Sequence, residues 1–335
     1  MLDHYFCDTN FRTIMKEKYI EIEKIYSSKH LMVVGDVMLD KYIWGTIDRI
    51  SPEAPVPVVH VENVEYHAGG AANVARNISG LGGRVSLVGL VGDGPSGSNL
   101  KTILAEDNLS NHYLVSDPNR ITTVKTRIIA QGQHVVRLDH EAKRVADNEI
   151  TTALKIIMTP LFEKVDGVLF QDYNKGVLSV ELISWVMDQA KGKSIPVYVD
   201  PKKHHFSYYR GARLFKPNYA EYLSIKNIKE DLKIDGENYR KESDFELLLI
   251  TCGADGMVLF FDEDYIRIPT RARAVHDVSG AGDTVIATFA LNDVCGLEPV
   301  DSAMLANLAA GKVCEAVGVV PITKETLMEI VDQYQ

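Results

Sequence analysis

Seven residues near the C-terminus combine two acids with three small residues, in the order Asp277-Val278-Ser279-Gly280-Ala281-Gly282-Asp283, and an apolar helical pattern follows them. Small residues at the start of a helix leave its free N–H groups open to an anion, which the positive end of the helix dipole also attracts. We therefore predict that Gly280, Ala281 and Gly282 hold phosphoryl oxygens. Asp283, in the first helical turn, would accept the proton of an attacking hydroxyl. The segment predicts phosphoryl transfer from a nucleotide to an alcohol, although a single acid at this position also occurs simply to complement the dipole.

A second glycine-rich segment, Gly69-Gly70-Ala71-Ala72-Asn73, also precedes a helical pattern. Two adjacent glycines let a ligand approach the backbone closely, and the amide of Asn73 offers both a donor and an acceptor to sugar hydroxyls. The alternative is a tight turn into a helix that begins with small residues. Taken together with the first segment, Gly69, Gly70 and Asn73 are candidates for sugar binding.

Polar side chains directly follow several apolar runs that are typical of strands: Asp36, Asp172, Asp200, Lys216, Asn218, Thr251 and Gly253. In open α/β sheets ligands bind beyond the carboxyl ends of the strands, so these residues are expected to face one crevice. Lys175 and Lys202, which closely follow two of the aspartates, are candidates for binding a phosphate group. For either segment the alternative is a solvated turn.

The segment Asn218-Tyr219-Ala220-Glu221 has the spacing of a helix capping box, with Asn at the N-cap and Glu at the third helical position. Glu221 is also a candidate for orienting waters on a Mg²⁺ ion that neutralises nucleotide phosphates. The two roles are compatible.

The run from Thr251 to Gly256 ends a very apolar stretch. It is interpreted either as a β-turn or as a glycine-rich loop against which a nucleotide could lie.

The composition excludes several classes of protein. Over 335 residues the net charge is −10, which argues against nucleic acid as a main partner. No apolar run approaches the roughly 20 residues needed to cross a bilayer, and residues 1–30 lack the apolar region of a secretory signal. The four cysteines are scattered, without the spacing of a zinc site. A cytoplasmic protein with reduced cysteines is expected.

Apolar runs at 31–34, 84–91, 166–171, 195–199, 212–215 and 246–251 mostly alternate with helical patterns at about 70–81, 97–107, 148–164, 179–191 and 218–226. This alternation predicts an α/β fold with a mainly parallel sheet covered on both faces. Helices at about 299–317 and 323–333 would close the chain. Residues 1–30 are expected to form a helical arm, and residues 31–335 one domain.

Two segments interrupt this rhythm. Residues 51–66 contain three prolines and then alternate in polarity, and residues 121–138 alternate again around a Gln131-Gly132-Gln133 turn. Strands of this kind do not belong in a buried parallel sheet. We predict a small second sheet, formed from about 41–68 and 120–140, whose apolar face requires a cover from substrate, the main domain or a second subunit.

Two glycine patterns are set aside. Gly92-Asp93-Gly94-Pro95-Ser96-Gly97 matches the dinucleotide-binding fingerprint in letters, but it lies on a later unit and Pro95 removes an N–H that a pyrophosphate would need. Gly192-Lys193-Ser194 resembles the end of a phosphate-binding loop, but Met187 stands where its first glycine belongs. His204-His205 is too isolated for a metal site.

The two glycine segments, 69–75 and 277–283, resemble the paired signatures of the PfkB/ribokinase family of carbohydrate kinases. The resemblance implies a three-layer α/β/α fold with a small β-sheet lid, and transfer of the γ-phosphoryl of ATP to a sugar hydroxyl with Mg²⁺ and, optionally, a monovalent cation. Asp283 would be the base, and Asp36, Asp40, Gly69, Gly70 and Asn73 would bind the sugar. The candidate nucleotide-binding residues are Lys216, Asn218, Glu221, Thr251, Gly253, Gly256, Ser279 and Asn307, with Glu221 reaching Mg²⁺ through water.

Further motifs are similar to those of the family's heptose 7-phosphate kinase domains, above all the run from Arg49 through Ser51-Pro52-Glu53-Ala54-Pro55 to Val58. This similarity implies the anomeric hydroxyl of D-glycero-D-manno-heptose 7-phosphate as acceptor and a homodimer formed through the lid. Candidates for binding the substrate are Arg49, Arg137, Asp172, Lys175 and Lys202, the basic residues for its existing phosphate.

Three features depart from that pattern or leave alternatives open. No HxGH motif of a nucleotidyltransferase is present in the 335 residues, so a kinase without the adenylyl-transfer half is expected. Lys203-His204-His205 differs from the sequence expected in that loop. Two alternatives therefore stay open: a kinase of the same family for another sugar, sugar phosphate or nucleoside, and a sugar-phosphate-binding protein without catalysis.

Overall fold

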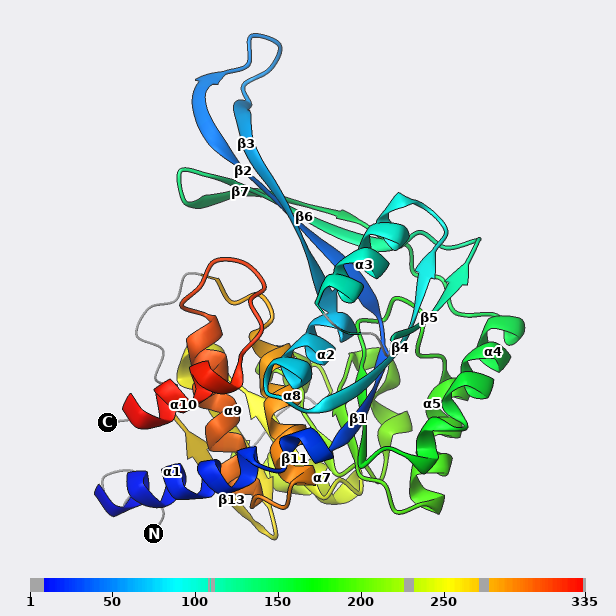
Figure 1. Cartoon of the computed structure of the whole chain (residues 1–335), viewed down its shortest axis with the longest axis vertical. Coiled ribbons are helices and arrows are strands. Elements are labelled where there is room, and N and C mark those ends of the chain that lie inside the picture. Colours follow the sequence, from blue (N-terminus) through cyan, green and yellow to red (C-terminus); the bar gives the residue numbers. More distant parts are fainter. Residues whose placement is uncertain (1–8, 108, 110–111, 226–231, 271–276, 334–335) are drawn as a thin grey trace.

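The computed structural model describes residues 9–107, 109, 112–225, 232–270 and 277–333. Within these residues, a nine-stranded sheet has the order β13-β12-β11-β10-β9-β8-β1-β4-β5 (Figure 1). Its strands are β1 (His30–Gly35), β4 (Arg84–Gly92), β5 (His112–Asp117), β8 (Gly167–Gln171), β9 (Val197–Asp200), β10 (Leu214–Phe215), β11 (Leu247–Thr251), β12 (Met257–Phe261) and β13 (Asp264–Ile268). All neighbours pair in parallel except β11–β12 and β12–β13, which confirms the mainly parallel sheet.

Helices cover both faces of the sheet because its central strands are apolar on both sides. In β1, Leu31 and Val33 pack into one apolar core, whereas Met32 and Val34 pack into the other. The first core includes side chains of α1 (Thr9–Glu23), α2 (Ala71–Gly80), α3 (Pro95–Glu106), α8 (Ala281–Val294), α9 (Pro299–Val313) and α10 (Lys324–Gln333). The second includes α4 (Asn148–Met158), α5 (Val180–Gly192), α6 (Tyr219–Leu223) and α7 (Leu232–Glu242). The fold is therefore the predicted three-layer α/β/α arrangement.

The sequence pattern misplaced or missed some elements. The helix predicted over 148–164 ends at Met158, because Pro160 has no N–H with which to continue it; a short 3-10 turn, Leu161–Glu163, follows. Strands β5, β12 and β13 and helix α7 were not predicted. None of the described helices has both the length and the apolar character needed to span a bilayer.

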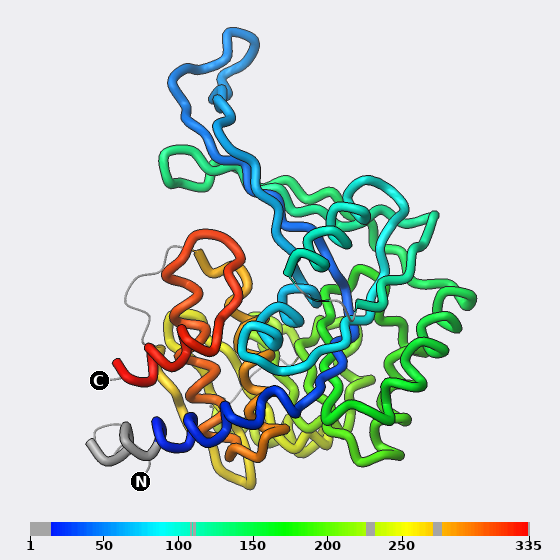
Figure 2. Tube along the Cα trace, viewed as in Figure 1, coloured from blue at the N-terminus to red at the C-terminus, as the bar shows by residue number. Residues whose placement is uncertain are grey.

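A second sheet confirms the prediction from the two irregular segments. It has the order β3-β2-β6-β7, with β2 (Val37–Ile50), β3 (Pro57–Gly70), β6 (Thr123–Ala130) and β7 (Gln133–His140). Figures 1 and 2 show that the β2–β3 hairpin extends far beyond the main body. We call this sheet the lid. Strand β2 begins only two residues after β1 ends, so the lid is rooted directly at the carboxyl edge of the main sheet.

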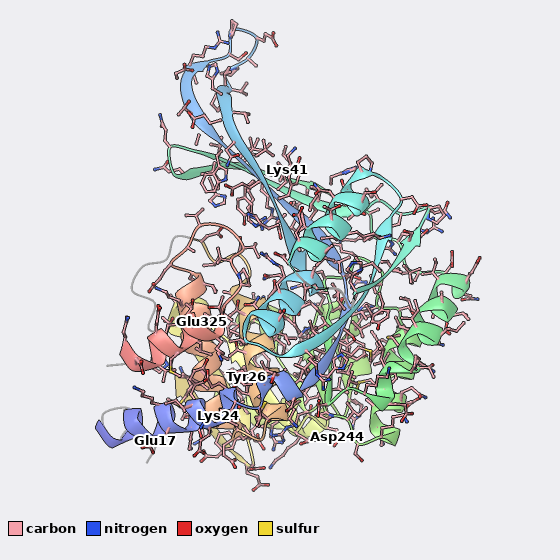
Figure 3. The ribbon with its side chains drawn as sticks, viewed as in Figure 1. Glu17, Lys24, Tyr26, Lys41, Asp244 and Glu325 are labelled. Atoms are coloured by element: carbon pink, nitrogen blue, oxygen red, sulfur yellow. The ribbon has the colours of Figure 1, made fainter. Side chains whose placement is uncertain are left out.

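Helix α1 packs against the C-terminal helices. Lys16 and Lys18 form ion pairs with Asp332 (2.8 Å) and Asp301 (2.5 Å), and the buried Tyr19 donates its hydroxyl to the carbonyl of Lys324 (3.1 Å). Figure 3 shows Glu17 and Tyr26 on the N-terminal segment, beside the helix that carries Glu325. Residues 1–8 of the predicted arm lie outside the described part of the chain. The described part of the N-terminal segment is thus a helix that packs against α9 and α10.

Candidate active site

A cavity of about 680 Å³ opens where helix α8 begins. Gly280 caps the helix with φ of +83°, and Gly280, Ala281, Gly282 and Asp283 all line the cavity. The Ala281 N–H donates to the carbonyl of Val278 (3.3 Å), so the N–H groups of Gly282 and Asp283 are the ones that this helix start offers to an anion in the cavity. Other lining residues are Tyr173, Asp200, Lys202, Lys216, Asn218, Glu221, Thr251, Gly253, Gly256 and Asn307. The structure therefore brings together all of the residues predicted to bind the nucleotide except Ser279.

Asp283 is buried and held by three donors. Its Oδ1 accepts from Gln171 Nε2 (2.9 Å) and the Tyr173 hydroxyl (2.8 Å), and its Oδ2 accepts from Asn73 Nδ2 (2.8 Å). Burial raises the pKa of Asp283 to about 7, while the bonds from Asn73 and Tyr173 oppose that rise. A carboxyl group with this pKa is suited to accepting a proton near neutral pH.

The two oxygens of Asp283 differ in their capacity to accept another proton. Each carboxylate oxygen offers about two lone-pair positions. Both positions on Oδ1 are used by Gln171 and Tyr173, whereas Oδ2 has only the bond from Asn73. An incoming hydroxyl would therefore donate to Oδ2. Neither Gln171 nor the Tyr173 hydroxyl was predicted as part of the site.

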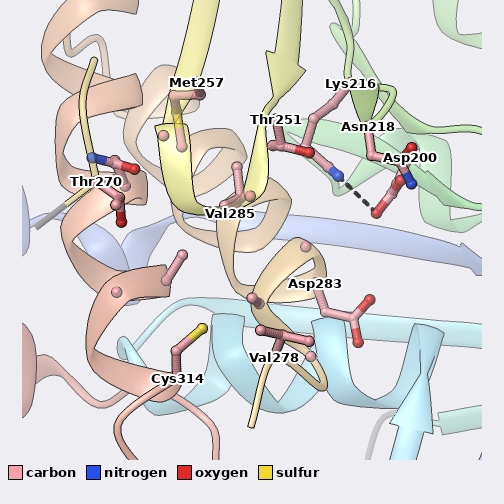
Figure 4. Close-up of a pocket in the computed structure, with 18 of the residues that line it drawn as sticks. Asp200, Lys216, Asn218, Thr251, Met257, Thr270, Val278, Asp283, Val285 and Cys314 are labelled. Atoms are coloured by element: carbon pink, nitrogen blue, oxygen red, sulfur yellow. Dashed lines mark ion pairs between the residues drawn. The ribbon is translucent and has the colours of Figure 1, made fainter. Parts of the chain in front are cut away.

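A lysine–aspartate pair lies close to the start of this helix, since a Cβ on Gly282 would be 3.5 Å from Lys216 Nζ. Lys216 Nζ lies 3.0 Å from Asp200 Oδ2, and both residues are buried (Figure 4). Gln171 Nε2 also donates to Asp200 (3.2 Å), so one amide links Asp200 to Asp283. Figure 4 shows Asp283 at the same end of the cavity as this pair, with Thr270 and Met257 at the other end. Charged side chains thus lie at one end of the cavity, and less polar side chains lie at the other.

The predicted capping box is present. The Asn218 side chain accepts from the Glu221 N–H (2.8 Å), and Glu221 Oε2 accepts from the Asn218 N–H (2.9 Å). The other oxygen of Glu221 forms an ion pair with Lys202. Thr251 bridges to Asn218 through the backbone, and the Asn307 amide donates to the carbonyl of Pro269 (2.8 Å). The capping interpretation of Glu221 is therefore confirmed, and its proposed role toward metal remains a prediction.

The residues present fit a magnesium ion that is bound mainly through nucleotide phosphates. Among the described residues no group of three or more His, Cys, Asp or Glu side chains is arranged as a metal cage. Mg²⁺ commonly binds through one or two carboxylates together with phosphates and waters, rather than in an all-protein cage. Glu221, which lines the cavity and is already partly neutralised by Lys202, would reach such an ion through water.

The sugar-side candidates meet at the root of the lid. Asp40 forms a buried ion pair with Arg127 of the neighbouring strand. A Cβ on Gly69 would lie 1.9 Å from Asp40 Oδ2, so only glycine leaves room for this carboxylate. Asn73 is bonded to Asp283 as described, and Gly70 ends β3 directly before α2.

Asp36 and Asp172 do not line the cavity but anchor the loop after β8. Asp36 accepts the backbone N–H groups of Tyr173 (2.9 Å), Lys175 (3.0 Å) and Val177 (3.1 Å). Asp172 accepts from Asn174 N (2.8 Å), His205 Nδ1 (2.7 Å) and the Tyr209 hydroxyl (3.0 Å). Both carboxylates are thereby committed to fixing the loop that carries Tyr173. Their contact with substrate stays a prediction.

Of the four basic residues predicted for the substrate phosphate, three form ion pairs within the chain. Lys175 pairs with Glu141 (2.5 Å), Lys202 with Glu221, and Arg137 with Asp139 (3.0 Å). Arg49 is exposed toward the tip of the lid hairpin. Each of the first three cations therefore already has a carboxylate partner.

Comparison with known proteins finds relatives of both the sequence and the fold. The sequence profile described as pfkB family carbohydrate kinase matches residues 28–326. The crystal structure of phosphofructokinase-2 from Escherichia coli in complex with substrates and products superimposes with a TM-score of 0.77, at 16% identity, over 91% of this chain and 99% of that one. At that identity the likeness shows the fold alone.

Closer sequence relatives bear one shared name. The protein "Bifunctional protein HldE" of Magnetococcus marinus is 39% identical over 309 residues, which cover 90% of this chain and 63% of that protein. The HldE protein of Nitratiruptor sp. is 41% identical over 304 residues, covering 89% of this chain and 64% of that protein. The chain thus spans less than two thirds of the length of these relatives.

Proposed function

The chain belongs to the pfkB family of carbohydrate kinases, and on that premise we propose that it phosphorylates the anomeric hydroxyl of D-glycero-D-manno-heptose 7-phosphate with ATP. The product would be heptose 1,7-bisphosphate, for ADP-heptose and lipopolysaccharide core biosynthesis. One observation carries the chemistry: a buried carboxyl with a pKa of about 7, Asp283, stands in the first turn of a helix whose N–H groups face a cavity. The choice of sugar is supported by the run from Arg49 to Val58 and by the identity to HldE proteins.

In this proposal Asp283 Oδ2 accepts the proton of the anomeric hydroxyl as that oxygen attacks the γ-phosphorus. The bond between the γ-phosphorus and its bridging oxygen breaks, and ADP leaves. The N–H groups around Gly280, Ala281 and Gly282 stabilise the negative oxygens of the transferring group. Lys216, held in place by Asp200, lies at the same end of the cavity and adds positive charge. Mg²⁺, when bound with ATP, would neutralise phosphate charge, with Glu221 orienting its waters.

A panel of phosphoryl acceptors tests the proposal. The purified chain is incubated with ATP, Mg²⁺ and, separately, heptose 7-phosphate, fructose 6-phosphate, ribose and a nucleoside, and products are followed by ³¹P NMR. We expect a new anomeric phosphate signal with heptose 7-phosphate and the highest kcat/KM for that acceptor. A higher kcat/KM for ribose or fructose phosphate would replace the heptose assignment with another substrate of the family. Binding of sugar phosphate with no ATP turnover on any acceptor would favour the non-catalytic alternative.

We also propose a homodimer formed through the lid. Residues that stand opposite one another in its register share a face, and one such face is largely apolar: Ile43, Val64, Ile128, Val136 and Leu138. Val64, Val136 and Leu138 are 39%, 44% and 53% exposed. A contiguous exposed apolar face is typical of a protein interface. A second copy of the same sheet presents the same apolar face and would cover it.

Replacing Val136 and Leu138 together by Asp is expected to convert the dimer to a monomer, because association would then bury two unpaired charges on each subunit. Molar mass is measured by size-exclusion chromatography with light scattering over a range of concentrations. Ile156→Asp is the matched control, since Ile156 is 68% exposed on α4, outside the lid. An unchanged mass for the double variant would contradict the lid interface.

A further inference from the structure

Lys125 is a cation of the lid without an ion-pair partner. It lies on β6, opposite Asp40 on β2 and Asp139 on β7, so all three side chains share one face of the lid. Asp40 pairs with Arg127, however, and Asp139 pairs with Arg137 at 3.0 Å. Among the residues that the structure describes, no carboxylate oxygen lies within 4.0 Å of Lys125 Nζ. The lid therefore presents one ammonium group that its own acids leave unpaired.

This ammonium group lies over the ring of Tyr173, a residue that lines the candidate active site. Lys125 Nζ lies 5.0 Å from the centre of the Tyr173 ring, and the Tyr173 hydroxyl donates to Asp283 Oδ1 at 2.8 Å. Lys125 is partly buried, and this burial lowers the pKa of its ammonium group because the charge is poorly solvated. A bound anion would stabilise the poorly solvated ammonium charge of Lys125. The aromatic ring and the charges of Asp40 and Asp139 supply part of this stabilisation, while the positive charges of Arg127 and Lys175 oppose it.

The neighbouring lysine provides a contrast. Lys202 Nζ lies 5.5 Å from the centre of the same ring, but it forms an ion pair with Glu221 on the nucleotide side. Of the two lysines over Tyr173, only Lys125 is therefore available for a new anion without breaking an existing pair.

We infer that Lys125 binds the phosphate group that the sugar substrate already carries, and so sets the preference for a phosphorylated acceptor. This inference rests on the proposed function, because it takes Asp283 as the group that receives the hydroxyl proton. Tyr173 contacts both groups, with Lys125 over its ring and Asp283 at its hydroxyl, so Lys125 and Asp283 are separated by about the size of that side chain. This separation suits a sugar whose reacting hydroxyl and existing phosphate are at opposite ends of the molecule. An ammonium–phosphate contact is a charge-assisted hydrogen bond, among the stronger polar contacts.

The test compares Lys125→Met with Lys41→Met. Lys41 is the matched control because it lies on the same lid with its ammonium group 5.5 Å from the centre of a tyrosine ring, that of Tyr66, but on the opposite face. That face is the one proposed for dimer contact, so the molar mass of both variants is measured as well. For Lys125→Met we expect the KM for heptose 7-phosphate to rise about 10- to 100-fold, as for loss of a hydrogen bond to a charged group. The KM for ATP, and kcat/KM for the unphosphorylated heptose, should stay within about twofold. Lys41→Met should match the wild type.

Lys125→Arg keeps the positive charge and should retain most of the preference, which separates loss of charge from loss of fold; melting temperatures are measured for all variants. An equal rise in KM for phosphorylated and unphosphorylated heptose in Lys125→Met would overturn the inference, as would an unchanged KM for both.

Direct binding keeps this test separate from the proposed function. Calorimetric titration with heptose 7-phosphate and with mannose 6-phosphate, without ATP, should show weaker binding to Lys125→Met than to Lys41→Met by the same factor. If the wild type transfers phosphate to no acceptor, the proposed function fails while this comparison still decides the role of Lys125. Equal binding by the two variants, or failure of the wild type to bind either sugar phosphate, would overturn that role.

Discussion

Asp283→Asn is expected to lower kcat by about 10²- to 10⁴-fold, the range that a general base contributes to a proton transfer. Asn has nearly the same shape but cannot accept the proton of an attacking hydroxyl. The variant is measured by coupled ATP turnover with heptose 7-phosphate. Binding of ATP should change little, because the helix N–H groups and Lys216 remain in place. Turnover near that of the wild type would remove Asp283 from the role of base.

The pH dependence supplies a second readout of the same group. Because the pKa of Asp283 is raised to about 7, the carboxylate needed as base is lost as pH falls below 7, and wild-type kcat/KM should fall about tenfold per pH unit there. The free energy of unfolding should change in the opposite direction to kcat/KM as pH rises. The folded state holds a proton on Asp283 that the unfolded state has released between the ordinary pKa of 3.8 and about 7, so stability falls as pH rises through this window. Asp283→Asn cannot titrate, and its melting temperature should decline less over the same range.

Several parts of the site follow from local sequence. The start of α8 was predictable because Gly280, Ala281 and Gly282 precede an apolar helical pattern, and a helix start dictates where free N–H groups lie. The capping box was predictable because Asn218 and Glu221 have the spacing that lets each satisfy the other's backbone N–H. Residues at strand ends, such as Asp200 and Lys216, were placed correctly because parallel strands bring their carboxyl ends to one edge.

What local sequence could not predict is which partner each polar group chooses. Asp36 and Asp200 both end apolar strands, yet one holds backbone N–H groups of a loop and the other pairs with a lysine in the cavity. Gln171 contacts Asp283 across 112 positions of sequence, and its only local signal is a polar residue ending an apolar strand. For Lys125 the alternation of β6 predicts a face, but only the register with β2 and β7 shows that its neighbouring acids are already paired.

Backbone geometry at the helix start gives a second large effect. Gly280→Ala should lower kcat by about 10²- to 10³-fold, comparable to loss of one donor that stabilises a developing oxyanion. A Cβ at this position would lie 2.8 Å from Asn73 Nδ2, the donor to Asp283 Oδ2, so the amide and the helix start must move apart. The residue also has φ of +83°, which costs about 1–2 kcal/mol for a residue with a side chain. The variant is measured by kcat and by thermal melting.

Gly296→Ala separates strain from damage to the site. Gly296 follows the other end of α8 with φ of +89°, and a Cβ there meets nothing within 4 Å. The left-handed backbone should cost each variant about 1–2 kcal/mol of stability, and the contact with Asn73 should add to that loss in Gly280→Ala only. Only Gly280→Ala should also lose turnover, because only its Cβ reaches the Asn73–Asp283 contact. Equal loss of turnover in the two variants would mean that helix stability, and not the geometry around Asp283, limits the reaction.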